Sequence, residues 1–104
     1  MTDTAKRNET DPPATIPVER VQTGVRMEKR LLKVLKGLAE YHDMTLGDLL
    51  EGIVLHVFDG KLPFDKASLD RIHLLREIYG LDLRAEASHL LSEKGRRDRK
   101  GGSR

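Results

Sequence analysis

Arginine and glutamine side chains occupy alternate positions near the beginning of this 104-residue chain. Arg20, Gln22 and Arg26 fall on one side of an extended backbone, with Gly24 between them, because successive side chains of such a backbone point in opposite directions. Arginine can donate paired hydrogen bonds to guanine O6 and N7, and glutamine can pair in the same way with adenine. This spacing therefore indicates a surface for base edges, although a strand with a solvated polar side shows the same pattern.

A second candidate site lies at the start of a predicted helix, at Thr45, Leu46 and Gly47. The first N–H groups of a helix and the positive end of its dipole attract phosphate, and Gly47 has no side chain to keep a phosphate away. Ordinary capping of the helix explains the same residues. We expect the phosphate contacts to come from six residues, namely Arg20, Lys29, Arg30, Thr45, Leu46 and Gly47.

Catalytic and metal-binding patterns are absent from the sequence. The chain has no cysteine, and its four histidines are far apart, with no pair at the three- or four-residue separation that places two ligands on one helix face. Its carboxylates mostly fall at predicted helix ends, where capping explains them. No glycine-rich phosphate loop is present. We therefore expect a protein that is not an enzyme and that has no metal and no cofactor.

The charge is unevenly distributed although the chain as a whole is only +2. Residues 19–36 and 93–104 each carry a net charge of +4, whereas residues 37–92 carry −5 and residues 1–18 carry −1. Two basic segments beside an acidic body indicate a local surface for an anionic polymer. A basic tail that merely aids solubility is the alternative for residues 93–104.

The first element that must position these residues is a strand. Val18–Met27 alternates between two faces, with Val21, Thr23, Val25 and Met27 on the inner one, which predicts a half-buried strand. A single strand leaves its backbone N–H and C=O groups without partners. Because the sequence contains no second convincing strand, the partner strand is expected from another copy of the chain.

Helices are predicted for the rest of the ordered chain. Apolar residues at helical spacing predict helices over Lys29–His42 and from a Thr45 cap to about Phe58, with a break at Asp43. Asp65 or Ser68 is expected to cap a third helix that stops near Gly80, and Asp82 a short fourth one. The predicted dimer core comprises Val21, Thr23, Val25, Met27, Leu31, Leu35, Leu38, Leu49, Leu50, Ile53 and Val57.

Four segments follow from this pattern. Residues 1–17 and 93–104 are polar, contain proline or glycine, and are predicted to be a disordered arm and a disordered basic tail. Residues 18–60 form the predicted dimerisation and DNA-binding domain, and residues 61–92 a helical extension. A core this small gains stability from oligomerisation.

From Val18 to Phe58 the sequence resembles the ribbon-helix-helix superfamily, in the style of the Arc and MetJ repressors of bacteria and phages. The resemblance rests on Val21–Met27, on the helix with Leu31 and Leu35, and on the Thr45 cap with the stripe that follows it. It implies a mainly α fold with one short strand, in an intertwined homodimer whose antiparallel two-stranded ribbon enters the major groove. The positions that read bases then fall on Gln22, Gly24 and Arg26.

The resemblance implies a sequence-specific, repressor-like regulator that binds double-stranded DNA as a homodimer. Because each dimer has few base-reading side chains, tight operators would require two dimers side by side or readout of DNA shape. One alternative is an antitoxin-type regulator whose residues 61–92 bind a partner protein. Another is a helical dimeric interaction module that does not bind DNA. No apolar run is long enough for a membrane helix, and the first residues do not read as a signal peptide. We expect a cytoplasmic, nucleoid-associated protein.

Overall fold

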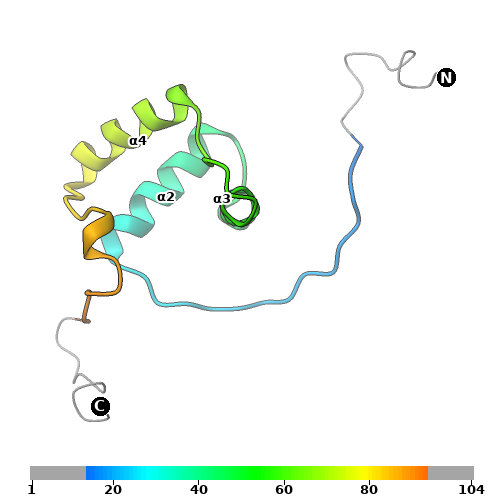
Figure 1. The fold of residues 1–104 in the computed structure, drawn as a ribbon, viewed down its shortest axis with the longest axis horizontal. Coiled ribbons are helices and arrows are strands. Elements are labelled where there is room, and N and C mark those ends of the chain that lie inside the picture. The colour runs from blue at the N-terminus through cyan, green and yellow to red at the C-terminus, as the bar shows by residue number, and fades with distance from the viewer. Residues whose placement is uncertain (1–13, 94–104) are drawn as a thin grey trace, which may run out of the picture.

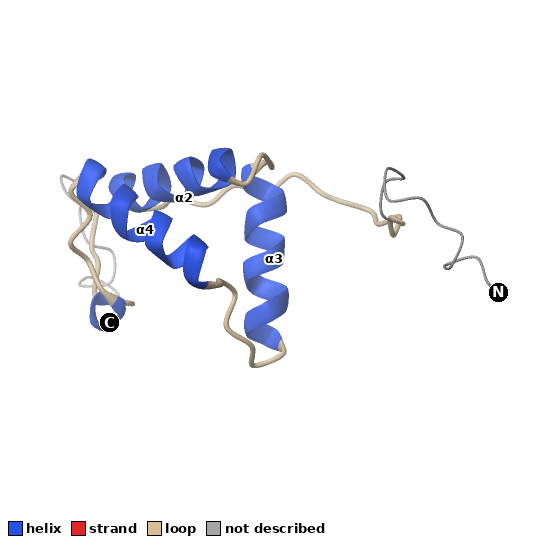
Figure 2. Ribbon diagram, turned by 90° about the horizontal axis from the view of Figure 1, so that it is seen from above, coloured by secondary structure: helices blue, strands red, loops and turns tan. Residues whose placement is uncertain are grey.

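All the regular elements are helical in the part of the chain that the computed structural model describes, residues 14–93. Its elements are α2 (Lys29–Tyr41), α3 (Leu46–Phe58), α4 (Lys66–Tyr79) and the 3-10 turn η1 (Ala85–Ala87). Helices α2 and α4 lie side by side, and α3 projects from them at a steep angle (Figures 1 and 2). The segment before α2 sweeps away from the helices as an open arc (Figure 1).

Each helix begins at a side chain that accepts a hydrogen bond from a backbone N–H of the first turn. Glu28 caps α2 by accepting from the Leu31 N–H at 2.8 Å, and Thr45 Oγ1 caps α3 by accepting from the Asp48 N–H at 3.1 Å. Asp65 accepts from the N–H of Ser68 at 2.9 Å at the start of α4. The caps predicted at Thr45 and Asp65 are confirmed, because these bonds satisfy N–H groups that a helix leaves without partners.

Left-handed residues follow all three α-helices, at Asp43, Gly60 and Gly80. Asp43 adopts a φ of 59° directly after His42, the C-cap of α2, and the N–H of Met44 returns to the carbonyl of Ala39 at 3.0 Å. Gly80 adopts a φ of 67° after α4, a conformation that glycine accepts without strain. The breaks predicted at Asp43 and near Gly80 are therefore confirmed.

The core lies mainly between α2 and α4. Leu38 is the most buried apolar side chain, and Leu75 of α4 and Leu49 of α3 pack in the same cluster as Leu38. At the crossing of α2 and α4, a β-carbon built on Gly37 would lie only 2.9 Å from Leu75 Cδ2. The residues after Gly60 thus complete the core of the described chain.

The predicted fold class is wrong. Residues 14–93 contain no strand, and the segment Val18–Met27 is neither helix nor sheet, whereas a ribbon-helix-helix protein requires a β-ribbon. Alternation of side chains favours an extended backbone, but a strand also needs a neighbour that completes its hydrogen-bond ladder. No other part of the described chain supplies one. Val21 and Val25, placed on the inner face of the predicted strand, are 82% and 76% exposed.

The fourth helix is also shorter than predicted. Only Ala85–Ala87 turn as a 3-10 helix, and its N-cap is Arg84 rather than Asp82. Most of the tails predicted to be disordered, residues 1–13 and 94–104, lies outside the described residues. None of the helices in residues 14–93 combines the length and the apolar character needed to cross a lipid bilayer.

Candidate nucleic-acid interface

A stripe of three lysines runs along the outer side of α2. Lys29, Lys33 and Lys36 lie at helical spacing within about 60° of one another, opposite the buried side chain of Leu38. All three are exposed. The stripe ends at Glu40, one turn further on. Lys33 and Lys36 were not among the predicted phosphate contacts, although their spacing from Lys29 was a signal that could have revealed them.

The open segment before α2 extends this basic surface. Gln22 and Gly24 are exposed in it, and the side chains of Arg20 and Arg26 are 66% and 73% exposed. Five basic residues, namely Arg20, Arg26, Lys29, Lys33 and Lys36, thus follow one another along a continuous stretch of chain. Of the predicted base-contacting residues, Arg26 lines a common hollow with Lys29 and Lys33, whereas Gln22 and Gly24 lie further out along the open segment.

Both arginines of the open segment are held by carboxylates of the same chain. Arg20 donates from Nε and Nη2 to the two carboxylate oxygens of Glu51 on α3, both at 2.7 Å. Arg26 donates in the same paired way to Glu93, 67 positions further along the chain. Hydrogen bonding to Glu51 and the charge of that group raise the pKa of Arg20, and the same bonds lower the pKa of Glu51.

A broad hollow lies between the start of α2, the end of α4 and the segment that carries Glu93. Its lining includes the cations Arg26, Lys29 and Lys33, the acidic Glu28 and Glu93, and apolar surface of Tyr79 and Leu91. The ammonium group of Lys33 sits 5.6 Å from the centre of the Tyr79 ring. This combination of cations and apolar surface suits an anionic group that is attached to an apolar or aromatic body.

Arg30 is hydrogen-bonded within the chain, and its predicted contact with phosphate stays a prediction. Its guanidinium donates to Glu28 at 3.0 Å, to the carbonyl of Gly80 at 2.9 Å and to Asp82 at 3.2 Å. These bonds join the start of α2 to the end of α4. The Arg30 side chain is only 37% exposed and is shared among three acceptors. Arg20 and Arg26 are more exposed and are each held by one exposed carboxylate, so they are the stronger candidates for phosphate contacts.

The start of α3 combines an accessible backbone with an opposing charge. Leu46 is half-buried, and Gly47 is exposed with open space where a β-carbon would stand. Asp48 in the first turn already gives this helix end a negative charge. That charge repels phosphate, whereas the helix dipole attracts it. The role predicted for Thr45, Leu46 and Gly47 stays a prediction, and the lysine stripe is the stronger candidate.

The residues predicted for a dimer core have mixed positions in the single chain. Leu38 and Leu49 are buried within it. Met27, Leu35, Leu50 and Ile53 are half-buried, and Val21, Thr23, Val25, Leu31 and Val57 are exposed. The buried members complete the chain's own core, and the exposed members leave apolar surface open.

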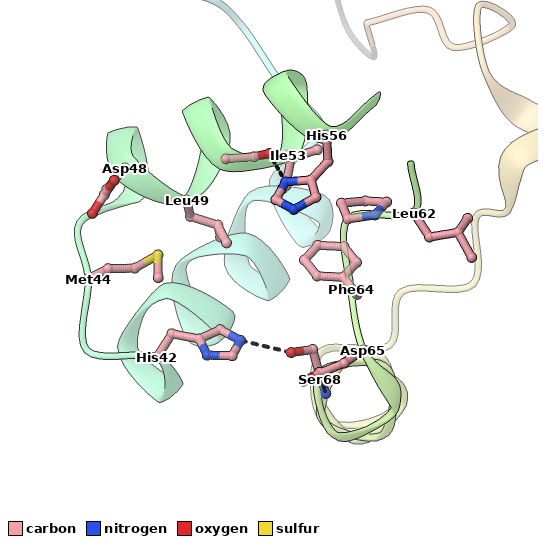
Figure 3. A pocket seen from close by; sticks show the side chains of 12 residues that line it. His42, Met44, Asp48, Leu49, Ile53, His56, Leu62, Phe64, Asp65 and Ser68 are labelled. Atoms are coloured by element: carbon pink, nitrogen blue, oxygen red, sulfur yellow. Dashed lines mark hydrogen bonds between the residues drawn. The ribbon is translucent and has the colours of Figure 1, made fainter. Parts of the chain in front are cut away.

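A cavity of about 550 Å³ lies among the end of α2, α3 and the start of α4 (Figure 3). A hydrogen bond of 3.0 Å joins His42 Nε2 to the hydroxyl of Ser68, which is buried. On the opposite side His56 Nδ1 donates to the carbonyl of Gly52 at 2.7 Å. Both histidines are thus hydrogen-bonded within the chain. The His42–Ser68 bond holds the start of α4 against the end of α2.

No protein-family model matches the chain, and no curated protein and no solved structure matches it. What the molecule does is therefore inferred from its own residues and their geometry. Two features stand out in residues 14–93, the basic surface along α2 with the open segment before it and the exposed apolar side of α3.

Proposed function

We propose that this protein is a DNA-binding regulator of repressor type that binds double-stranded DNA as a homodimer. The observation that carries the proposal is the run of exposed basic residues made by Arg20, Arg26 and the lysines at 29, 33 and 36, of which Arg26, Lys29 and Lys33 line one hollow. Lysine and arginine side chains that neutralise phosphates release counterions, and this release dominates the affinity of proteins for DNA. Residues 37–92 carry a net charge of −5, which repels the duplex and keeps this part of the chain away from it.

Base contacts are proposed for the open segment. Arg26 carries paired donors, which match guanine O6 and N7 in the major groove. Gln22 carries a donor and an acceptor, which match adenine N7 and N6. Gly24 lets the backbone approach the duplex closely, since it has no side chain. The lysine stripe of α2 would then lie along the phosphates beside that groove.

The homodimer is supported by the apolar surface of α3. Leu55, Phe58 and the following Leu62 are 65%, 79% and 87% exposed, and Leu49 is the one buried residue of the helix. Apolar residues thus lie on the outward side of α3 as well as on its buried side, and such a helix is normally covered. A second copy of a small chain is a suitable cover, because a lone core of this size is marginally stable.

Salt dependence of binding tests the phosphate contacts. Fluorescence anisotropy with a labelled duplex, repeated at several salt concentrations, gives the slope of log K against log salt. Lys33→Gln is expected to make this slope shallower by about 0.9 for each phosphate that the protein no longer neutralises. Lys61→Gln, an equal charge change beyond α3, is expected to leave it unchanged. Equal slopes for both variants would exclude the lysine stripe as the contact surface.

Sequence preference tests the base contact of Arg26. Arg26→Ala is expected to lower discrimination between a preferred and a mismatched duplex by about 1–3 kcal/mol, because the substitution removes one bidentate interaction with a base. If the variant keeps the full preference, Arg26 does not read bases. If the wild-type protein shows no binding to duplex DNA at low salt, the exposed apolar side chains Leu69, Leu74 and Ile78 of α4 favour a protein interaction module instead.

A further inference from the structure

Two glutamates from separate parts of the fold hold the two arginines of the open segment in the same manner. Glu51 belongs to α3, and Glu93 follows the 3-10 turn. In each pair the arginine uses Nε and Nη2 together, and both carboxylate oxygens accept. The pairs span 31 and 67 positions of the chain, so the tertiary fold creates them.

The edge of the guanidinium that these carboxylates occupy, Nε with Nη2, is one of the two edges through which arginine can bind DNA. Arginine binds a phosphate through two parallel N–H donors, and it binds guanine O6 and N7 through a similar pair. A carboxylate presents two acceptor oxygens with closely matching geometry. Neither arginine can make a second bidentate contact through this edge while the glutamate occupies it.

We infer that Glu51 and Glu93 imitate DNA acceptors in the free protein and compete with DNA for Arg20 and Arg26. This inference rests on the proposed function. The occupant that displaces each glutamate is a group with two adjacent acceptor atoms, either a phosphate or the edge of a guanine. Glu93 lies in the hollow beside Lys29 and Lys33, so a phosphate that replaces it gains two further cations.

The exposure of the pairs makes the competition easy to reverse. The side chains are 66% and 45% exposed in the Arg20–Glu51 pair, and 73% and 41% in the Arg26–Glu93 pair. Exposed ion pairs are weak because water and salt screen them. The glutamates therefore reduce the affinity for DNA moderately, and a duplex at sufficient concentration displaces them.

Replacing each glutamate by the uncharged glutamine tests the inference. Anisotropy titrations compare the full-length wild type with Glu51→Gln, Glu93→Gln and the double variant, using one G·C-rich and one A·T-rich duplex. Each single variant is expected to bind duplex DNA about threefold more tightly than wild type, and the double variant about tenfold. The expected effects are small because exposed ion pairs are weak. Glu86→Gln is the matched control, because Glu86 is exposed and belongs to the same C-terminal part of the chain as Glu93.

The outcomes separate the two proposals. Tighter binding to both duplexes supports competition with phosphate, and tighter binding confined to the G·C-rich duplex supports competition with guanine. If Glu51→Gln and Glu93→Gln bind DNA no more tightly than Glu86→Gln, the competition is overturned while the proposed function stands. If no variant and no wild-type protein binds either duplex, the proposed function and this inference both fail.

Discussion

Single carboxylates have a strong local role in this fold, and Asp65 illustrates it. The backbone N–H of Ser68, together with the Ser68 hydroxyl, holds the pKa of Asp65 below its ordinary value. The ionised carboxylate is therefore the form that the folded state prefers. Its contribution to stability is complete above the pKa of the unfolded chain and is lost as the pH falls through the lower pKa of the folded state.

Two substitutions at this position separate capping from charge. Asp65→Ala is expected to lower the melting temperature at pH 7, because the Ser68 N–H loses its acceptor. The difference from wild type should shrink as the pH falls through the carboxylate range. Asp65→Asn keeps a capping oxygen that does not titrate, so it should melt close to wild type at pH 7. Melting curves of both variants at pH 7 and in acid test these expectations. If Asp65→Ala lowers the melting temperature by the same amount at every pH, the ionised carboxylate of Asp65 does not stabilise the fold.

Packing between elements depends on the close approach of α2 and α4. Gly37 lies at their crossing, where a β-carbon would stand 2.9 Å from the buried Leu75 side chain. Gly52 in α3 is different, since nothing lies within 4 Å of the position that its β-carbon would take. The two glycines therefore predict opposite effects when a side chain is added.

Denaturant unfolding measures this difference. Gly37→Leu is expected to destabilise the fold by roughly 1–3 kcal/mol, since the added atoms overpack the contact with Leu75. Gly52→Ala is expected to stabilise it by about 1 kcal/mol, because alanine is the better residue in a helix interior. An unchanged midpoint for Gly37→Leu would show that α4 does not pack on α2 as described.

At the scale of the whole molecule, the uncovered side of α3 predicts self-association. We expect sedimentation experiments to give twice the mass of one chain at micromolar concentration. Phe58→Lys should raise the Kd of the dimer about tenfold or more, because a charge placed in an apolar interface costs more than about 1.4 kcal/mol. Leu69→Lys is the control, an equal substitution at an exposed apolar residue of α4. A monomer at all concentrations would contradict the homodimer.

The sequence by itself determined the three helices and most of their ends. Thr45, Asp65 and Gly80 act on N–H and C=O groups within a few residues, so their effects are local and can be predicted from the chain alone. The strand prediction failed because alternation at Val18–Met27 is also a local signal, whereas a strand needs hydrogen-bond partners that are distant in sequence.

Only the tertiary structure decided which residues distant in sequence contact one another. The Gly37–Leu75 contact, the bonds from Arg30 to Gly80 and Asp82, and the pairing of Arg26 with Glu93 join residues far apart in sequence. Their partners follow from how the helices pack and turn, which residue spacing along one segment does not encode. The predicted DNA-contacting arginines were visible in the sequence, but the carboxylates that hold them became apparent only once the chain was folded.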